Sequence, residues 1–298
     1  MAPSARPLRV ACLGDSWISD YERGEHADYW KLESHLPEAF LERLEAESDR
    51  DVEFVIAGFP GFTSARLLQL AKLCRLRDMA RVHERRGVHL PASGSLKTAL
   101  WQLGIPCAWA DSESQEEDVD LVLIVAGYND LKYGEGGPDA VARRLLQLRR
   151  LYASRGVEAV LVTIGEGAPD VEARRRRANR RLLADAEAGV VSCDDFVRGL
   201  GREMWANMEH FTPEGYRALG SMLGASAAQR LREGTLCSPD SAPRRREWDE
   251  SWWDEVERSC GGTSSCLSKK RRCSQPAMEW PCKRAKSGWE RSSWAGRS

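Results

Sequence analysis

The chain has 298 residues, 42% of them hydrophobic, which is enough for a sizeable folded core. Its formal net charge of −1 provides no direct evidence for binding to nucleic acid, and no apolar run is long enough to cross a bilayer. No apolar signal segment stands near the first residue, so we expect an intracellular, cytoplasmic protein that does not associate with membranes.

Short apolar segments alternate with amphipathic ones along residues 6–234, in the pattern of strands followed by helices. The expected strands are Leu8–Leu13, Val52–Ile56, Val119–Val125, Val157–Ile164 and Val190–Ser192. The expected helices are Tyr29–Glu47 with a break or second start at Pro37, Ser64–Arg77, Leu96–Leu103, Pro138–Ser154, Val171–Glu187 and Thr212–Arg232. This alternation predicts an α/β domain, built as a doubly wound, flavodoxin-like sandwich around roughly five parallel strands.

Residues 78–118 lie between the second and third expected strands and form the least regular part of this domain. They contain a basic helical stretch, a turn rich in Pro, Gly and Ser, a short helix candidate and an acidic run. Insertions between the strands of an α/β sheet often form lids or substrate walls. We therefore expect a helical insertion, either a lid or a pair of helices that covers a sheet edge.

Polar or glycine-containing loops follow three of the expected strands. They are Gly14-Asp15-Ser16, Gly58-Phe59-Pro60-Gly61 and Gly127-Tyr128-Asn129-Asp130, and His210 stands just before the last helix. The carboxyl ends of parallel strands meet at one edge of the sheet, where such folds hold their reactive groups. Acyl transfer by a serine needs a hydroxyl, a base and donors for the oxyanion, and these segments offer all three. We expect Asp15 and Asp130 to brace their loops through hydrogen bonds to backbone N–H groups.

In these four blocks and their order, the chain resembles the SGNH hydrolases, also called the GDSL esterase/lipase superfamily. The resemblance covers roughly residues 8–231. It implies that Ser16 is the nucleophile and that His210 is the general base.

The resemblance also implies an oxyanion hole. Its donors would be the backbone N–H groups of Ser16 and Gly61 and the side-chain amide of Asn129. Gly58 is the alternative to Gly61. The family's chemistry implies no metal and no organic cofactor.

One position departs from the family pattern. The family usually places an aspartate three residues before this histidine, and here that position is Asn207. An asparagine oxygen can accept a hydrogen bond from the imidazole, but it carries no charge to stabilise the imidazolium, and in serine proteases this exchange costs about 10⁴ in turnover. Glu209 is adjacent in sequence, but we expect its side chain to point elsewhere. Asp194 or Asp195, which follow the last strand, or a backbone carbonyl could take the orienting role instead, and the sequence does not choose between them.

The leading hypothesis is a serine esterase that hydrolyses carboxylic esters of small molecules, with short acyl groups such as acetyl, through an acyl-enzyme. Two alternatives stay open. One is a binding module on the same scaffold with weakened catalysis, which Asn207 favours. The other is an acyltransferase that uses the same serine and histidine chemistry.

Residues 235–298 differ in composition from the rest of the chain. They contain 13 Lys and Arg against 9 Asp and Glu, a net of +4, which leaves −5 for the remainder. Aliphatic residues are few, so we expect a disordered tail. Its tryptophans either dock on an unknown protein or are scattered through a polar segment without a binding role. Its five cysteines lack the paired spacing of a zinc site. The clusters Lys269–Arg272 and Lys283–Lys286 match a two-part nuclear import signal or are solvating charge, so a nuclear location stays an alternative to a cytoplasmic one.

Overall fold

The computed structural model describes part of the chain. The described residues are 6–18, 21–23, 29–31, 35–48, 51–84, 95–103, 119–134, 136–167, 169–185, 189–206 and 210–233. All of them belong to the first of two units into which the chain divides, Met1–Arg245. The predicted tail, residues 235–298, lies outside the described residues.

A parallel sheet of five strands forms the centre of the described unit. The strands are β1 (Leu8–Gly14), β4 (Val52–Gly58), β5 (Leu121–Val125), β6 (Glu158–Val162) and β7 (Val190–Val191). Their order across the sheet is β4-β1-β5-β6-β7, and every neighbouring pair is parallel. The order therefore reverses between β1 and β5, which is where open α/β sheets place their ligand sites. This arrangement confirms the predicted doubly wound fold.

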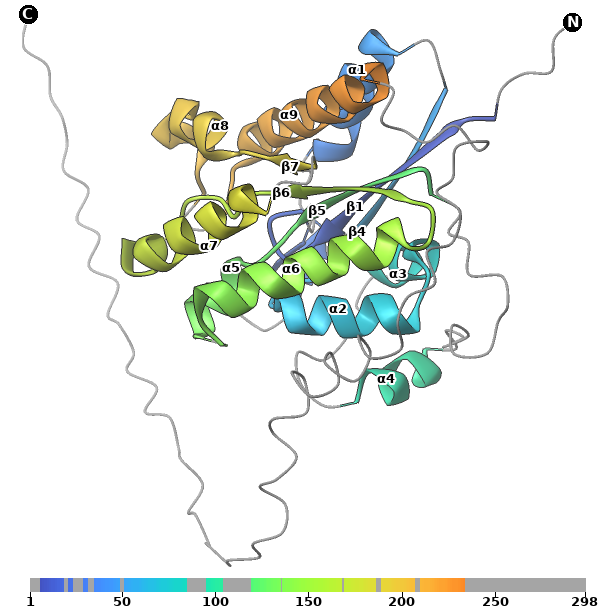
Figure 1. Cartoon of the computed structure of the whole chain (residues 1–298). Helices are drawn as coiled ribbons and strands as arrows, with labels where there is room; N and C mark the ends of the chain where they lie inside the picture. The colour runs from blue at the N-terminus through green and yellow to red at the C-terminus, as the bar shows by residue number, and fades with distance from the viewer. Residues whose placement is uncertain are drawn as a thin grey trace, which may run out of the picture. The chain divides into compact units, whose positions relative to one another are not determined.

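Helices cover both faces of the sheet (Figure 1). One layer consists of α1 (Leu36–Glu47), α8 (Asp194–Gly199) and α9 (Pro213–Arg232). The other consists of α2 (Ser64–Leu73), α3 (Leu76–Glu84), α6 (Gly137–Ala153) and α7 (Glu172–Ala184). Shorter elements are α4 (Leu96–Gln102), α5 (Tyr128–Tyr133) and the 3₁₀ turns Pro169–Val171 and Arg202–Met204.

Successive side chains of each central strand enter different cores, because they point to opposite faces of the sheet. In β1, Ala11 and Leu13 pack with the α2 and α6 layer, whereas Val10 and Cys12 pack with the α1 and α9 layer. The strands are thus buried on both faces, as their nearly continuous apolar sequence predicts.

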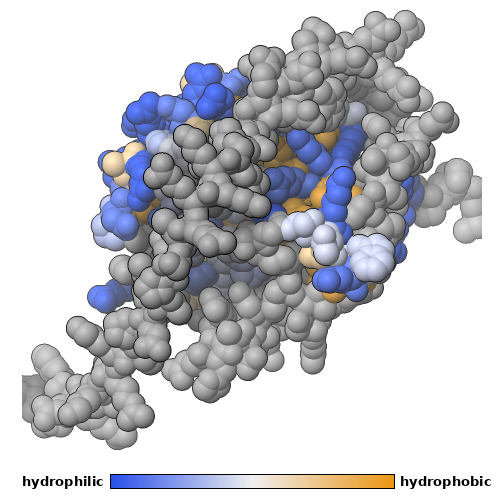
Figure 2. Space-filling model, turned by 90° about the horizontal axis from the view of Figure 1, so that it is seen from below, coloured by the Kyte–Doolittle hydropathy of each residue, from blue (hydrophilic) through white to orange (hydrophobic). Residues whose placement is uncertain are grey.

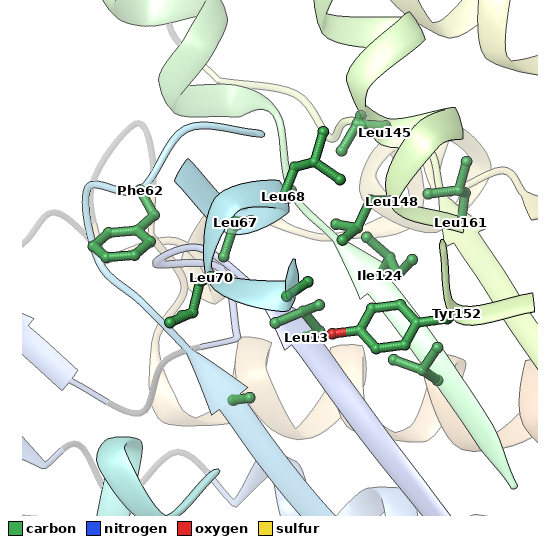
Figure 3. Packing of buried hydrophobic residues seen from close by; sticks show 14 of the residues in the cluster. Leu13, Phe62, Leu67, Leu68, Leu70, Ile124, Leu145, Leu148, Tyr152 and Leu161 are labelled. Carbon is green, nitrogen blue, oxygen red and sulfur yellow. The ribbon is translucent and has the colours of Figure 1, made fainter. Parts of the chain in front are cut away.

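In the core under α2 and α6, the apolar faces of these helices pack against the sheet. Figure 3 shows Leu148 and Tyr152 of α6 close to Leu13 and Ile124 of the central strands, with Leu145 beyond Leu148, all of them buried. The three α6 residues recur at the spacing of one helix face, which explains why this segment folds as a helix on the sheet.

Figure 2 views the molecule from below relative to Figure 1, and the described residues seen there are mostly hydrophilic around smaller hydrophobic areas.

The prediction of one helix over Tyr29–Glu47 is wrong in its first part. Tyr29–Lys31 is a strand, β3, that pairs antiparallel with β2 (Tyr21–Arg23) in a separate sheet. The helix begins only at Leu36, with Pro37 in its first turn. Proline lacks an N–H and is tolerated there but not in a helix interior, so Pro37 marks the second start rather than a break within one helix.

The helix predicted over Ser64–Arg77 is also two helices. α2 ends before Cys74, and α3 starts at Leu76 and packs against the edge strand β4. Within α3, Met79 and Val82 are part of the core. The start of the predicted insertion thus covers a sheet edge. Residues 85–94 and 104–118 of the insertion lie outside the described residues, so the lid stays a prediction.

Among the helices of the described residues, none combines the length and the apolar character needed to span a membrane.

Candidate active site

The first loop of the candidate site follows β1. Gly14 lies so close to β5 that a Cβ atom at this position would stand 1.9 Å from the carbonyl oxygen of Val125. Asp15 is buried, and its Oδ1 accepts a hydrogen bond of 3.1 Å from the N–H of Trp17. Ser16 is half-buried, and its carbonyl oxygen accepts a hydrogen bond of 3.3 Å from the Tyr216 hydroxyl of α9. Ser16 therefore lies in a tightly held turn at the carboxyl end of β1.

The second loop follows β4 and lies beside the first. The N–H of Phe59 donates to the carbonyl of Gly14 at 2.9 Å, and the N–H of Phe62 donates to the carbonyl of Phe59 at 3.0 Å. Pro60 and Gly61 occupy the centre of this turn, and Gly61 has a φ of +77°, as in a type II turn. Within the described part of the chain, no hydrogen bond from the Gly61 N–H is seen. Gly61 thus offers a backbone donor close to the Ser16 loop.

The third loop joins β5 to α5 and supplies the amide of Asn129. This side chain is 6% exposed, and its Nδ2 donates a hydrogen bond of 3.1 Å to the carbonyl of Phe62. An amide nitrogen carries two hydrogens, so one remains for another acceptor. The bond places the Asn129 amide beside the turn that contains Gly61, so the structure brings these two predicted oxyanion donors together.

The buried aspartates hold these loops in place, as expected. Asp130 accepts hydrogen bonds of 2.6 Å from both the N–H and the hydroxyl of Ser64, the first residue of α2, and forms an ion pair of 2.8 Å with Arg144. Burial raises the pKa of the Asp15 carboxyl from its ordinary value of 3.8 to about 7, and the nearby charge of Asp130 also raises this pKa. Backbone N–H groups, that of Trp17 first among them, act in the opposite direction.

A short antiparallel pairing before α9 holds the segment that contains His210. The carbonyl of His210 accepts a hydrogen bond of 3.0 Å from the N–H of Ala206, and Phe211 pairs with Trp205 in a β-bridge. The ring of Phe211 packs edge to face on the indole of Trp17, with ring centroids 4.9 Å apart. His210 is half-buried. The segment that contains His210 is thus held against the loop that contains Ser16.

Which group orients the His210 ring stays a prediction, because several candidates lie outside the described residues. Asn207 and Glu209 lie outside the described residues, as does the side chain of Asp195. The Asp194 carboxylate accepts a hydrogen bond from the buried guanidinium of Arg175 and forms an ion pair with it.

Two contacts of the site were missed in the sequence. The first is the packing of Trp17 on Phe211, and the second is the bond from Tyr216 to the Ser16 carbonyl. Trp17 and Phe211 each stand next to a predicted catalytic residue, so their position in the sequence was a signal, but the pattern does not reveal that they touch. In the part of the chain that the structure describes, no cluster of three His, Cys, Asp or Glu side chains could hold a metal ion.

Comparison with known proteins shows which family the chain is similar to. Residues 12–218 match the model of the GDSL-like Lipase/Acylhydrolase family. Among solved structures, Est24, a carbohydrate acetylesterase from Sinorhizobium meliloti, is 15% identical and superposes with a TM-score of 0.50, covering 74% of this chain and 99% of its own. No curated protein matches the chain.

Two further solved structures are similar at the same low level. The lipase/acylhydrolase from Enterococcus faecalis is 14% identical with a TM-score of 0.49, covering 75% of this chain and 96% of its own. The native M. smegmatis aryl esterase is 15% identical with a TM-score of 0.49, covering 77% of this chain and 100% of its own. Since the family model extends over more than half of the chain, the protein belongs to the GDSL-like lipase/acylhydrolases, the SGNH hydrolases.

Proposed function

We propose that the protein is a serine esterase that hydrolyses small carboxylic esters through an acyl-enzyme on Ser16. The observation that supports this most is the contact between Trp17 and Phe211, because it joins the loop of Ser16 to the segment of His210. The hydrogen bond from Asn129 to Phe62 adds a second support, since it joins the side chain of Asn129 to the turn that contains Gly61, and these are two of the proposed oxyanion donors.

The proposed reaction begins with attack of the Ser16 hydroxyl oxygen on the ester carbonyl carbon while His210 accepts the hydroxyl proton. The carbonyl electron pair moves onto oxygen. The backbone N–H groups of Ser16 and Gly61 and the side-chain amide of Asn129 stabilise this oxyanion. The tetrahedral intermediate then releases the alcohol, whose oxygen takes the proton from His210. Water attacks the acyl-enzyme in the same way and regenerates Ser16 with release of the acid.

We propose acetyl and other short acyl groups as the substrates, because the sequence contains no recognisable lipid-binding segment. An acetylated sugar is the second substrate to test, since the solved carbohydrate acetylesterase shares this fold. The GDSL-like family of acylhydrolases as a whole is consistent with a small-molecule ester.

The test is hydrolysis of p-nitrophenyl acetate by the wild type, Ser16→Ala and Ser226→Ala. Ser226 is a matched control, because it is a partly buried serine whose hydroxyl contacts Met222, one turn back in α9, through its carbonyl oxygen and its sulfur. We expect Ser16→Ala to lose the activity and Ser226→Ala to retain it. Equal rates for wild type and Ser16→Ala would remove Ser16 from the reaction.

The alternative of a binding module has one specific feature in its favour, the asparagine at position 207. A fluorophosphonate probe separates the two functions, because it labels an activated serine and leaves an idle one unmodified. The acyltransferase alternative shares the acyl-enzyme. It predicts that acetyl groups pass to an added sugar hydroxyl rather than to water, which product analysis distinguishes.

We propose that the protein is cytoplasmic, with a nuclear location as the alternative if the basic clusters Lys269–Arg272 and Lys283–Lys286 act as a nuclear import signal. Fusing residues 235–298 to a fluorescent protein tests the import signal. Fluorescence confined to the cytoplasm would dismiss the import signal.

A further inference from the structure

The loop after β6, residues 163–167, contacts the first and third site loops, although it contributes no residue to the proposed reaction. A Cβ atom at Gly165 would lie 1.9 Å from Cη2 of Trp17, and a Cβ atom at Gly167 would lie 2.1 Å from Cε2 of Tyr128. These distances leave space for hydrogen atoms only. Trp17 directly follows Ser16, and Tyr128 directly precedes Asn129.

Both aromatic rings are enclosed in the protein interior, which limits their movement away from this loop. Trp17 and Tyr128 are each 3% exposed. The indole of Trp17 also packs against Phe211 at a centroid distance of 4.9 Å and against Trp205 at 6.2 Å. Because protein interiors are close-packed, a methyl group added at Gly165 would displace the indole together with its backbone.

The start of the loop is also fixed, because buried polar side chains of α7 bind the backbone of Ile164, the residue before Gly165. The Asn179 amide closes a pair of hydrogen bonds on Ile164, accepting from the N–H at 2.9 Å and donating to the carbonyl at 2.8 Å. Arg175 donates a further bond of 3.0 Å to the same carbonyl. Arg175 is 3% exposed and forms two bonds of 2.7 Å and 2.9 Å with Glu172, so its own position is determined.

We infer that Gly165 and Gly167 are positioning residues for the reaction. Gly165 sets the position of the Ser16 hydroxyl through the indole of Trp17, and Gly167 sets the position of the Asn129 amide through the ring of Tyr128. The inference rests on the proposed function, since it concerns the alignment of the proposed nucleophile and oxyanion donor. It extends the site to a strand end that carries no reacting group.

The expected effect of Gly165→Ala follows from the need for exact alignment of reacting atoms. A misplacement of about 1 Å costs about a hundredfold in rate. We therefore expect kcat for p-nitrophenyl acetate to fall about a hundredfold. KM should change little, because the substrate still binds beside a displaced nucleophile.

The experiment is a size exchange between positions 165 and 17. Gly165→Ala, Trp17→Phe and the double variant are compared with wild type by kcat, KM and the rate of fluorophosphonate labelling. The shorter phenylalanine ring does not reach the positions of the Cη2, Cζ3 and Cζ2 atoms that the new methyl group would meet. Gly199→Ala is the matched control, because a Cβ atom at the exposed Gly199 meets nothing within 4 Å.

We expect the double variant to exceed each single variant in kcat and in labelling rate, and Gly199→Ala to match wild type. This comparison holds even if Gly165→Ala alone does not fold, because the double variant is then compared with Trp17→Phe. The inference is wrong if Gly165→Ala equals Gly199→Ala, or if the double variant is no better than Trp17→Phe. A wild type that neither turns over the ester nor reacts with the probe overturns the proposed function itself, and the inference with it.

Discussion

The indole of Trp17 lies edge to face on the ring of Phe211, with centroids 4.9 Å apart and an angle of 76° between the planes. These residues are the chain neighbours of Ser16 and His210, which come from opposite ends of the domain sequence. Aromatic pairs of this kind contribute about 0.5–1.5 kcal/mol beyond the area they bury. Assembly of the proposed catalytic pair is therefore coupled to packing of the core beneath α9.

Replacing Asn129 by alanine tests the side-chain oxyanion donor. We expect kcat for p-nitrophenyl acetate to fall by about 10²–10³, because one donor to the developing negative charge is lost. Asn129→Asp is the matched variant, since its ionised carboxylate keeps the size of the amide but can only accept hydrogen bonds. Both variants should lose activity while their thermal unfolding shows that they are folded. A folded Asn129→Ala enzyme with wild-type turnover would exclude the amide from the oxyanion hole.

Asn207→Asp tests whether His210 lacks a charged partner. A carboxylate at this position would stabilise the imidazolium that forms during attack, so we expect kcat to rise roughly tenfold or more. Asn207→Ala is the control, because it removes the side-chain acceptor without adding charge. If the aspartate variant shows no gain, another group orients the ring.

The architecture was predictable because each buried strand has its own local pattern. The run Val119–Val125 is nearly all apolar, and β5 occupies Leu121–Val125 within it. The cap of the last helix was equally local, and Thr212 indeed accepts a hydrogen bond from the Gly215 N–H at 3.2 Å. The β2–β3 pairing was missed, because the aromatic residues at its second strand also fit the spacing of the helix that follows.

Long-range contacts of the site leave no such local pattern. The fit of Gly165 against Trp17 joins residues from the ends of two strands, and neither segment alone indicates the other. Asp194, a candidate for orienting His210 because it follows the last strand, forms an ion pair with the buried guanidinium of Arg175, and no local pattern in the sequence indicates this pair. Which of several acids near a strand end pairs with which base depends on side-chain packing, and the sequence pattern does not encode this directly.

The buried Asp15 should make stability depend on pH. Its pKa is about 7 in the folded protein and about 4 when unfolded, so between these values the folded state binds more protons. The contribution of Asp15 to the free energy of unfolding is therefore fully present below about pH 4. It decreases as the pH rises to about 7, by at most about 4 kcal/mol. Urea unfolding at a series of pH values should show Asp15→Asn with a flatter profile over this range. An unchanged slope in the variant would contradict the raised pKa.

Asp130 should contribute strongly to stability. Asp130→Ala leaves the Arg144 guanidinium and the Ser64 N–H without their carboxylate, and we expect a loss of about 3–5 kcal/mol in the free energy of unfolding. Asp139→Ala is the comparison, because its ion pair with Arg177 is exposed to solvent. Its effect should be clearly smaller, since water already screens such a pair. Equal urea midpoints for the two variants would count against the bracing role of Asp130.

The most direct measurement is the site of covalent labelling by a fluorophosphonate, mapped by mass spectrometry of the digested protein. The proposal predicts a phosphonyl adduct on Ser16 in the wild type, slower labelling in His210→Ala and none at this peptide in Ser16→Ala. Absence of an adduct on Ser16 in the folded wild type, under conditions that label a known serine hydrolase, would show that this serine is not an activated nucleophile.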